Sequence, residues 1–333
     1  MKKHEMEQAA LALADRLGQI DYQQLPVSDY NKKYIARLKP ALSYYMLIYA
    51  DCLYRGTMMA HTPLSSLIFV DYGGGSGFLS LLAKELGVGK IIYIDLNPHS
   101  VETVRILKKE TGLGPDVILH GDSSKLAEWC RAEKVIPHLL VAADLIEHVY
   151  RLDTFFEDLM KVNNGMQMIF TTASSPFNPY VKWKLRRLMK RCETGSLESP
   201  NYYTRRKQFI RENYPRFSPA EIEVWSRKSR GMTFDDLRQA IRQNALPEPA
   251  DPYNTCDPAT GNWTERILPV RVYRALAPEG YSLHIKKGFY NENRTNPIFG
   301  VICKGINFLI RHTGKAALWF APFILLIYVR KRK

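Results

Sequence analysis

The chain has 333 residues, of which 46% are hydrophobic and 24% are charged. These fractions are close to those of globular proteins, so they exclude a disordered chain and a bundle of membrane-spanning helices. The formal net charge of +14 favours an anionic partner, such as a phosphorylated substrate, a nucleic acid or a membrane surface. The five widely spaced cysteines indicate a reducing compartment, and the N-terminus lacks the continuous apolar stretch of a secretory signal. We therefore expect a cytoplasmic protein.

The N-terminal segment, residues 1–65, has the pattern of helices. Leu11, Ala14 and Leu17 repeat at helical spacing, and the run over 34–53 is apolar and aromatic. We predict that this segment forms a helical cap on the rest of the chain.

From Ser66 onward, short apolar runs that end in Gly or Asp alternate with helical stretches. We place strands at 67–71, 90–95, 116–120, 138–143 and 166–172, and helices at 77–86, 98–109, 124–133 and 147–162. Five consecutive strand–helix steps predict an α/β fold with a Rossmann-like, doubly wound sheet.

A basic segment follows, over residues 176–262. Within it, Lys182–Arg230 carries fourteen Lys and Arg against five Glu, a net charge of +9, interleaved with aromatic residues. The stretch 246–262 is rich in Pro, Asp, Asn and Thr, which is typical of a loop. We predict a basic helical insertion that acts as a substrate lid and favours an anionic acceptor; a solvated helical surface is the alternative.

A glycine loop connects the first predicted strand to its helix. Gly73, Gly75 and Gly77 have the spacing G-x-G-x-G, and such a loop lets backbone N–H groups approach a ligand closely. Phe78 occupies the position where the dinucleotide fingerprint has glycine or alanine, which disfavours a pyrophosphate. Asp71, two residues before the loop, would repel phosphate but suits an amino group, so a zwitterionic ligand is favoured.

Two further acids follow the next strands. Asp95 ends the second predicted strand, where a carboxylate can accept both hydroxyls of a ribose. Asp122 follows the third strand and could accept a hydrogen bond from an adenine amino group. Each acid alone also fits a strand end or a helix cap, so their joint spacing carries the inference.

These motifs together resemble the class I S-adenosylmethionine-dependent methyltransferases over residues 66–175. Asp71–Gly77 is similar to motif I, and the strings DLIEHV (144–149) and FTT (170–172) look most like the ubiquinone-biosynthesis O-methyltransferase branch. The resemblance implies S-adenosylmethionine as cofactor, in contact with Asp71, Tyr72, Gly73, Gly75, Gly77, Asp95, Leu96, Asp122, Ser123 and Asp144.

The resemblance also implies a seventh strand that runs antiparallel between strands five and six. Residues 263–276 would then form the last crossover helix, 279–290 strand six and 322–330 strand seven. The core would comprise 66–175 and 263–333. The apolar run 316–329 is too short to span a membrane, which supports its assignment to the sheet.

His148 is the candidate general base, because it follows the fourth strand at the edge where the methyl group should point. Glu147 precedes it and is the second candidate catalytic residue. Two alternatives remain open: His148 packs under the lid or caps the helix, or Glu147, His148 and Asp144 bind a metal ion, which no further nearby ligand supports.

An amphipathic insertion is predicted at 297–320. Its apolar positions on one helical face are Ile298, Phe299, Ile302, Ile306, Leu309 and Ile310, beside Lys304, Arg311 and Lys315. This pattern fits either peripheral contact with a membrane surface or packing on the sheet.

For the function, we expect methyl transfer to the hydroxyl of a small acceptor that is anionic or lipid-linked, such as a glycan or a prenylated molecule. An RNA or protein methyltransferase and a non-catalytic scaffold that binds the cofactor are the alternatives. A nucleic acid is the less favoured partner, because no RNA-binding module is recognisable.

Overall fold

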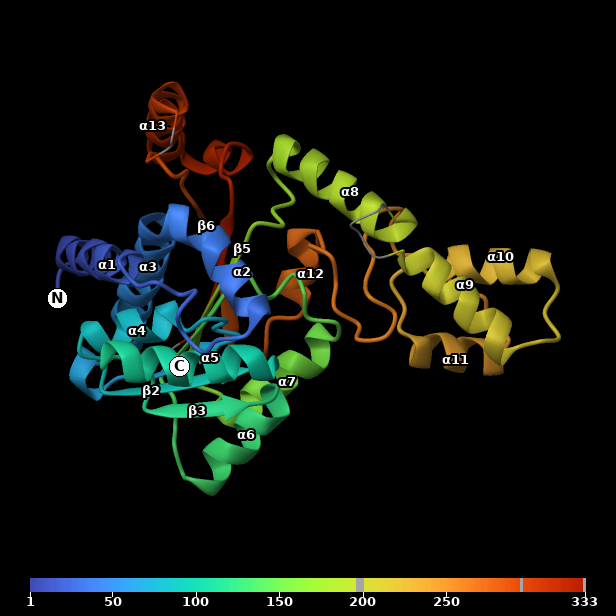
Figure 1. The fold of residues 1–333 in the computed structure, drawn as a ribbon, viewed down its shortest axis with the longest axis horizontal. Coiled ribbons are helices and arrows are strands. Elements are labelled where there is room, and N and C mark those ends of the chain that lie inside the picture. Colours follow the sequence, from blue (N-terminus) through green and yellow to red (C-terminus); the bar gives the residue numbers. More distant parts are fainter. Residues whose placement is uncertain (196–200, 294–295, 332–333) are drawn as a thin grey trace.

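The computed structural model describes residues 1–195, 201–293 and 296–331. A seven-stranded sheet in the order β3-β2-β1-β4-β5-β7-β6 forms its centre (Figure 1). The strands are β1 Ile68–Tyr72, β2 Lys90–Asp95, β3 Val117–His120, β4 Leu139–Ala143, β5 Gln167–Thr172, β6 Tyr281–Lys287 and β7 Ile324–Arg330. β7 pairs antiparallel with both β5 and β6, and all other pairs are parallel. This confirms the predicted Rossmann-like sheet of the class I methyltransferase type.

The central strands are buried on both faces because helices cover the sheet from both sides. Every residue of β5 is buried, as are the first four of β4, which explains their continuous apolar sequences. The crossover helices are α4 Phe78–Glu85, α5 Pro98–Thr111, α6 Ser123–Ala132 and α7 Leu152–Val162. The strand and helix bounds predicted between 66 and 133 agree with these to within about two residues.

The N-terminal residues form the predicted helical cap. Its helices are α1 Lys3–Gly18, α2 Asp29–Leu38 and α3 Leu42–Ala60. α3 lies so close to the sheet that a Cβ at Gly56 would come within 2.2 Å of the Leu139 side chain on β4. This approach brings the aromatic residues of α3 to the central strands.

The insertion is helical but projects sideways from the core (Figure 1). It consists of α8 Pro179–Thr194, α9 Tyr202–Asn213, α10 Pro219–Lys228 and α11 Phe234–Arg242. Its small core includes Phe209, Ile210, Trp225 and Leu237. Since the insertion has its own core and extends outward, it forms an arm beside the sheet edge, and its role as a substrate lid stays a prediction.

The expected crossover helix at 263–276 is wrong in its first half. Only α12, Val270–Ala275, is helical. Pro269 immediately precedes it, and a proline disfavours helical geometry in the residue before it. Residues 263–266 instead pair with the loop after β4: Trp263 N donates to His148 O at 3.2 Å, and Arg266 N to Glu147 O at 3.2 Å.

The expected helix at 147–162 begins five residues late, at Leu152. Asp144 has a left-handed backbone with φ of 50°, and His148 N donates to Leu145 O at 2.8 Å in a tight turn. This turn buries Ile146 completely. The residues around 147 therefore form a tight turn that places Ile146 in the core, and not the first turn of a helix.

The carboxyl-terminal strand provides a test of the fold. Because β7 lies between β5 and β6 and its residues from Ile324 to Tyr328 are at most 3% exposed, deletion of all residues after Ala321 should unfold the catalytic core and expose two strand edges. Circular dichroism and thermal unfolding would measure this, with a chain ending at Lys331 as control. A folded truncation product would contradict the strand's structural role.

Candidate functional site

The glycine loop lies at the carboxyl end of β1 and requires glycine at three positions. Gly73, Gly75 and Gly77 have φ values of 65°, 53° and 78°, in the left-handed region. A Cβ at Gly73 would come within 1.9 Å of the Leu145 side chain, and one at Gly77 within 2.6 Å of Val104. The loop therefore packs tightly at the sheet edge, where Gly73 N donates to Ile94 O at 2.7 Å and Gly77 N to Gly74 O at 2.8 Å.

The buried side chain of Asp71 packs against the backbone of this loop at Gly74. Its side chain is 1% exposed, and Ser80 Oγ donates to its Oδ2 at 2.6 Å. A Cβ at Gly74 would lie 2.6–2.7 Å from the carboxyl group. Burial raises the pKa of Asp71 to about 7. Any effect of Asp71 on a bound amino group would therefore act through the loop that it holds.

Asp95 joins the glycine loop to the end of β2. Gly75 N donates to Asp95 Oδ2 at 2.9 Å, and Asn97 N donates to Oδ1 at 2.8 Å. Each carboxylate oxygen keeps further acceptor capacity for a hydroxyl pair. The next residue, Leu96, is 70% exposed and offers an apolar surface at the same edge.

Three more residues are predicted to contact the cofactor: Asp122, Ser123 and Tyr72. The Asp122 carboxyl group lies at the sheet edge, whereas the side chains of Ser123 and Tyr72 point into the protein. Asp122 Oδ1 caps α6 by accepting from Ser124 N and Lys125 N. By contrast, the Ser123 hydroxyl donates to Asp158 Oδ2 at 2.9 Å, and the Tyr72 ring packs in the core under α7. The last two residues can therefore offer only main-chain groups to a ligand at the edge.

A cavity of about 540 Å³ opens beside the loop, at the carboxyl ends of β4 and β5. Its lining comprises Tyr34, Arg37, Leu38, Tyr44, Tyr45, Ile48, Tyr49, Ala143, Asp144, His148, Thr171, Ala173, Glu265, Pro322 and Phe323. The tyrosines come from α2 and α3, so the N-terminal cap builds the aromatic wall. Tyr34 also approaches the glycine loop, with its hydroxyl 3.6 Å from the position of a Cβ at Gly75.

Sequence reasoning missed these tyrosines as site residues. The aromatic run at 34–53 indicated a helix, but which side of that helix faces the cavity depends on how α3 docks on the sheet.

Asp144 lines the cavity just after β4. Its backbone N donates to Thr171 O at 3.1 Å, and its Oδ1 accepts from Ala173 N at 3.3 Å, so β5 holds it in place. Asp144 is exposed by surface area, but the cavity walls around it partly desolvate its carboxyl group. This desolvation and the nearby charge of Glu265 raise the pKa of Asp144 to about 6.

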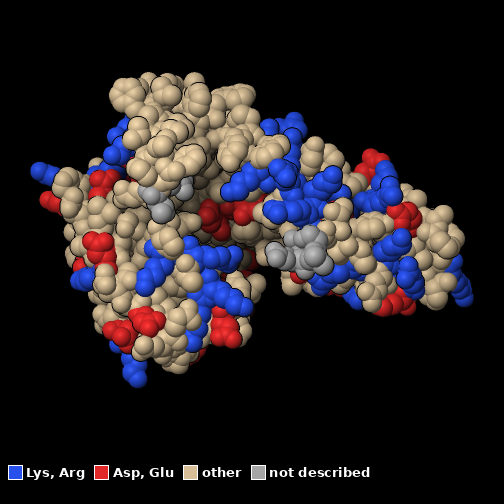
Figure 2. Space-filling view, turned by 45° about the horizontal axis from the view of Figure 1, so that its top comes forward, with Lys and Arg blue, Asp and Glu red and all other residues tan. Residues whose placement is uncertain are grey.

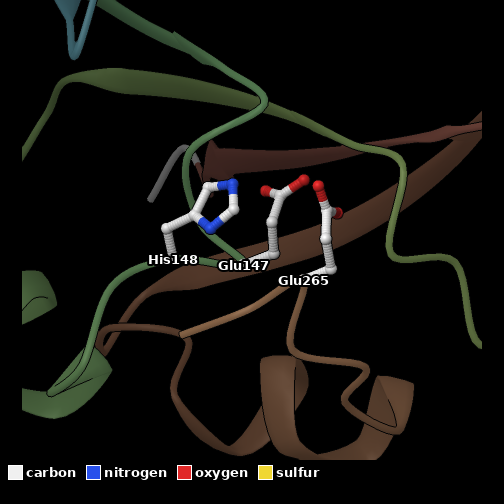
Figure 3. Close-up of side chains that lie close together, drawn as sticks. All are labelled: Glu147, His148 and Glu265. Atoms are coloured by element: carbon white, nitrogen blue, oxygen red, sulfur yellow. The ribbon is translucent and has the colours of Figure 1, made fainter. Parts of the chain in front are cut away.

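Glu147, His148 and Glu265 form a cluster next to Asp144 (Figure 3). The two carboxyl groups point toward each other, with the His148 ring beside Glu147. Glu265 belongs to the segment that pairs with the loop after β4, and Ser174 Oγ donates to its Oε2 at 3.0 Å. The sequence analysis did not single out Glu265, because it falls in the stretch expected to be a helix.

One hydrogen bond determines the tautomer of His148. Its Nδ1 lies 2.7 Å from the carbonyl oxygen of Trp263. Since a carbonyl only accepts, Nδ1 must carry the proton, and the neutral ring presents a lone pair on Nε2. His148 lines the cavity, so this lone pair is available for a proton or a metal ion.

Glu147 lies behind the cavity wall. It is 1% exposed, and neither carboxyl oxygen reaches a partner at hydrogen-bonding geometry among the described residues. Burial and the charges of Asp144 and Glu265 raise the pKa of Glu147 well above its ordinary value, and the nearby Thr172 offsets only part of this. Glu147 therefore influences the cavity through its neighbours and does not line it.

The same cluster has the composition of a cation site. The candidate ligand atoms of Glu147, His148 and Glu265 all lie within 4.8 Å of one another. Carboxylate and imidazole ligands suit a divalent cation, and the unpartnered oxygens of Glu147 would gain a counter-charge. The sequence alternative of a metal ion on Glu147, His148 and Asp144 thus keeps two of its residues, and Glu265 takes the place of Asp144.

Acidic side chains gather in the hollow between the core and the arm, and Lys and Arg border it (Figure 2). Among the residues that line the cavity, Arg37 is the only Lys or Arg, against Asp144 and Glu265. The +9 segment therefore does not line this cavity, and the anionic acceptor that its charge favours stays a prediction.

Comparisons with known proteins are limited in extent. No family model matches the chain. A ribosomal protein L11 methyltransferase of Hamiltonella defensa is 31% identical over 113 residues, which is 33% of this chain and 35% of that protein. The chain thus spans about a third of the length of this curated relative.

Solved structures with a similar fold have low identity. The plantazolicin methyltransferase BpumL in complex with SAH is 10% identical, with a TM-score of 0.40 over 99% of this chain and 98% of that one. An S-adenosylmethionine-dependent methyltransferase from Mesorhizobium loti is 14% identical, with a TM-score of 0.38 over 81% and 94%. The strand order of the sheet, and not these likenesses, carries the assignment to the class I methyltransferase fold.

Asp71 provides a test of the loop's support. The folded state raises its pKa to about 7, so the unfolded chain releases this proton at lower pH than the folded chain does. The stability of the wild type should therefore fall, relative to Asp71→Asn, as pH rises from about 4 to about 7, by a few kcal/mol at about 1.4 kcal/mol per pKa unit. Chemical unfolding across this range measures it, with the exposed Asp15→Asn as control. A pH-independent difference would contradict the buried position.

Proposed function

We propose that the chain is an S-adenosylmethionine-dependent methyltransferase that acts on a hydroxyl group. One observation carries the proposal: the glycine loop bonded to Asp95 opens at the same sheet edge as an aromatic cavity that contains His148. A cofactor site and an acceptor site side by side are what a transfer reaction needs. A scaffold that only binds cofactor would not require the second cavity.

The cofactor would lie across the carboxyl ends of β1, β2 and β3. The backbone of the loop at Gly73, Gly75 and Gly77 would border its amino-acid part, Asp95 would accept the ribose hydroxyls, and Leu96 would cover the adenine ring. When bound, the sulfonium supplies an activated methyl group with a good leaving group. The protein then contributes mainly alignment and the exclusion of water.

Further contacts complete this placement. Asp122 and the main chain of Ser123 would meet the adenine edge, and the main chain of Tyr72 would border the loop. Asp144 lies between the two sites and would place a carboxyl group near the positive sulfonium.

His148 would act as general base. Its Nδ1–H is held by the Trp263 carbonyl, so Nε2 can take the proton of an acceptor hydroxyl as the oxygen attacks the methyl carbon. Glu147 is too deeply buried to touch the acceptor, and we assign it a positioning role beside Glu265.

The acceptor that best suits this cavity is a small aromatic or prenylated hydroxyl compound. Four tyrosines supply flat apolar surfaces, and the acids Asp144 and Glu265 disfavour a negative charge inside. An anionic part of a lipid-linked acceptor would have to lie outside the cavity, along the basic helix α8.

A protein acceptor is the second candidate, because the curated relative is named for a ribosomal protein. Incubation of the protein with methyl-labelled cofactor and cell fractions separates the two. Label in extracted lipid or small molecules supports the proposal, label in protein or RNA replaces the acceptor class, and binding without transfer would leave only a scaffold.

Asp95→Ala should weaken cofactor binding at least tenfold. The variant loses hydrogen bonds to a charged acceptor, each of which is worth about 1.5–3 kcal/mol. Isothermal calorimetry measures this, with exposed Glu128→Ala on α6 as control and thermal unfolding to verify that the loop variant is folded. Equal affinity in folded wild type and variant would remove Asp95 from the cofactor site.

His148→Ala should lower kcat by about 10²–10⁴ and leave cofactor affinity nearly unchanged, as expected for the loss of a general base. Turnover with the labelled acceptor and calorimetry with the cofactor measure the two effects separately. Normal turnover would show that His148 is structural.

The cation alternative predicts a different response of the same cluster. Chelation would then abolish turnover, added Mg²⁺ would restore it, and Glu265→Gln would weaken metal binding measured without cofactor or acceptor. Turnover that is insensitive to chelation would leave His148 as a base without a metal ion.

A further inference from the structure

A second functional surface lies on the excursion between β6 and β7. It consists of α13, Pro297–His312, and the short helix η3, Gly314–Trp319, which stand out from the body of the molecule (Figure 1). We call it the α13 face. Its large apolar side chains are between 44% and 68% exposed: Ile298, Phe299, Val301, Ile302, Phe308, Leu309, Trp319 and Phe320. Isolated exposed apolar residues are common, but such a concentration marks an interaction surface.

Polar contacts lock the helix with its apolar side outward. Asn307 is 2% exposed: its Nδ2 donates to Tyr290 O at 2.9 Å and to Glu292 Oε1 at 2.8 Å, and its Oδ1 accepts from Tyr290 N at 2.7 Å. Gly300 permits close contact, because a Cβ there would come within 2.8 Å of Glu292 O. The side that packs on the body is therefore narrow and partly polar.

This orientation corrects one detail of the sequence analysis. The sequence predicts Ile306 and Ile310 on one helical face with the other apolar residues, but Ile310 is 4% exposed and Ile306 is half-buried. One edge of the helix packs on η3 and on the loop after β6, and the broader apolar side remains uncovered. Of the two alternatives, packing accounts only for the minor face.

Basic and aromatic side chains border the α13 face. Lys304, Arg311 and Lys315 are exposed on the same excursion. Helix α8 begins next to the end of this excursion, because Asn178 Nδ2 donates to Ala321 O at 3.0 Å. Figure 2 shows the broad uncharged surface with Lys and Arg gathered beside it over α8.

The exposed part of α8 continues the same pattern. Tyr180 and Trp183 are 65% and 53% exposed and stack at 6.1 Å, and Arg187 lies 4.8 Å from the Trp183 ring. Tryptophan, tyrosine and cationic side chains are the residues that favour the boundary between water and lipid headgroups.

We propose that the α13 face binds the surface of a lipid bilayer that carries anionic headgroups. The apolar side chains would enter the headgroup boundary while the basic residues around them pair with the negative charge. No helix in the described part of the chain is long and apolar enough to cross a membrane, so the helix would lie in the plane of the surface. A projecting convex helix suits a deformable lipid surface better than a flat protein partner.

Docking through the α13 face would bring the cavity close to the membrane surface. Pro322 and Phe323, which line the acceptor cavity, follow the end of η3 at Trp319 after only Phe320 and Ala321. A docked molecule would hold its cavity next to the lipid boundary, where a prenylated acceptor resides. The docking itself rests on the exposed face alone, whereas this role also rests on the proposed function.

Vesicle flotation tests the docking. The full chain should float with vesicles of phosphatidylcholine and phosphatidylglycerol and much less with phosphatidylcholine alone. Val301→Ser combined with Phe308→Ser should weaken partitioning at least about tenfold, because two exposed apolar side chains are lost. The matched control combines Val224→Ser with Leu246→Ser, two residues that are each 45% exposed elsewhere, and should float like the wild type.

Two further measurements distinguish the attraction between basic residues and anionic headgroups from the insertion of apolar side chains. Lys304→Glu combined with Lys315→Glu should reduce binding to anionic vesicles and weaken its salt dependence. A blue shift of tryptophan emission on vesicle addition should be smaller in Trp319→Phe, because Trp319 enters the boundary.

Several outcomes would overturn the proposal. These are absence of flotation, equal flotation of the serine variant, or a dimer in light scattering that this variant dissociates, since the occupant would then be a second copy. Calorimetry with S-adenosylmethionine on the same variant should show unchanged affinity. This result keeps a failure of docking distinct from a failure of the proposed methyl transfer.

Discussion

The antiparallel pairing of β7 between β5 and β6 is the constraint on which the arrangement of the functional surfaces depends. In this register Ile324, the first residue of β7, lies opposite both Thr172 at the end of β5 and Lys287 at the end of β6. The carboxyl ends of β5 and β6 therefore meet at one edge. The arm leaves the sheet after β5, and the α13 excursion leaves after β6, so both emerge beside the cavity that the tyrosines line.

This topology also explains why the cavity is assembled from distant segments. The loop after β4 provides His148, the segment that returns from the arm provides Glu265, and the cap provides its tyrosines. The hydrogen bonds between 147–148 and 263–266 hold the first two segments together. The arm thus contributes to the site through its base, where it rejoins the core, and not through its basic helices.

Charge is divided between the interior and the periphery. Asp144, Glu147 and Glu265 lie close together, and burial with mutual repulsion raises the pKa of Asp144 and Glu147. Such a group of acids is costly unless protons or a cation neutralise it. The excess positive charge of the chain lies instead on the arm and around the α13 face, where solvent or anionic lipid headgroups can meet it.

The parallel part of the sheet and the glycine loop at its edge could be predicted from the amino-acid sequence. Local signals suffice there, because a glycine loop and strand-end acids such as Asp71 and Asp95 act within one strand–helix unit, and continuous apolar runs mark buried parallel strands. The cavity beside the loop could not be predicted in this way. Three features depend on contacts between segments far apart in the chain: the approach of Glu265 to Glu147, the tyrosine wall and the outward orientation of α13. The spacing of hydrophobic residues indicates that a side of a helix is buried, but it does not indicate which segment packs against that side.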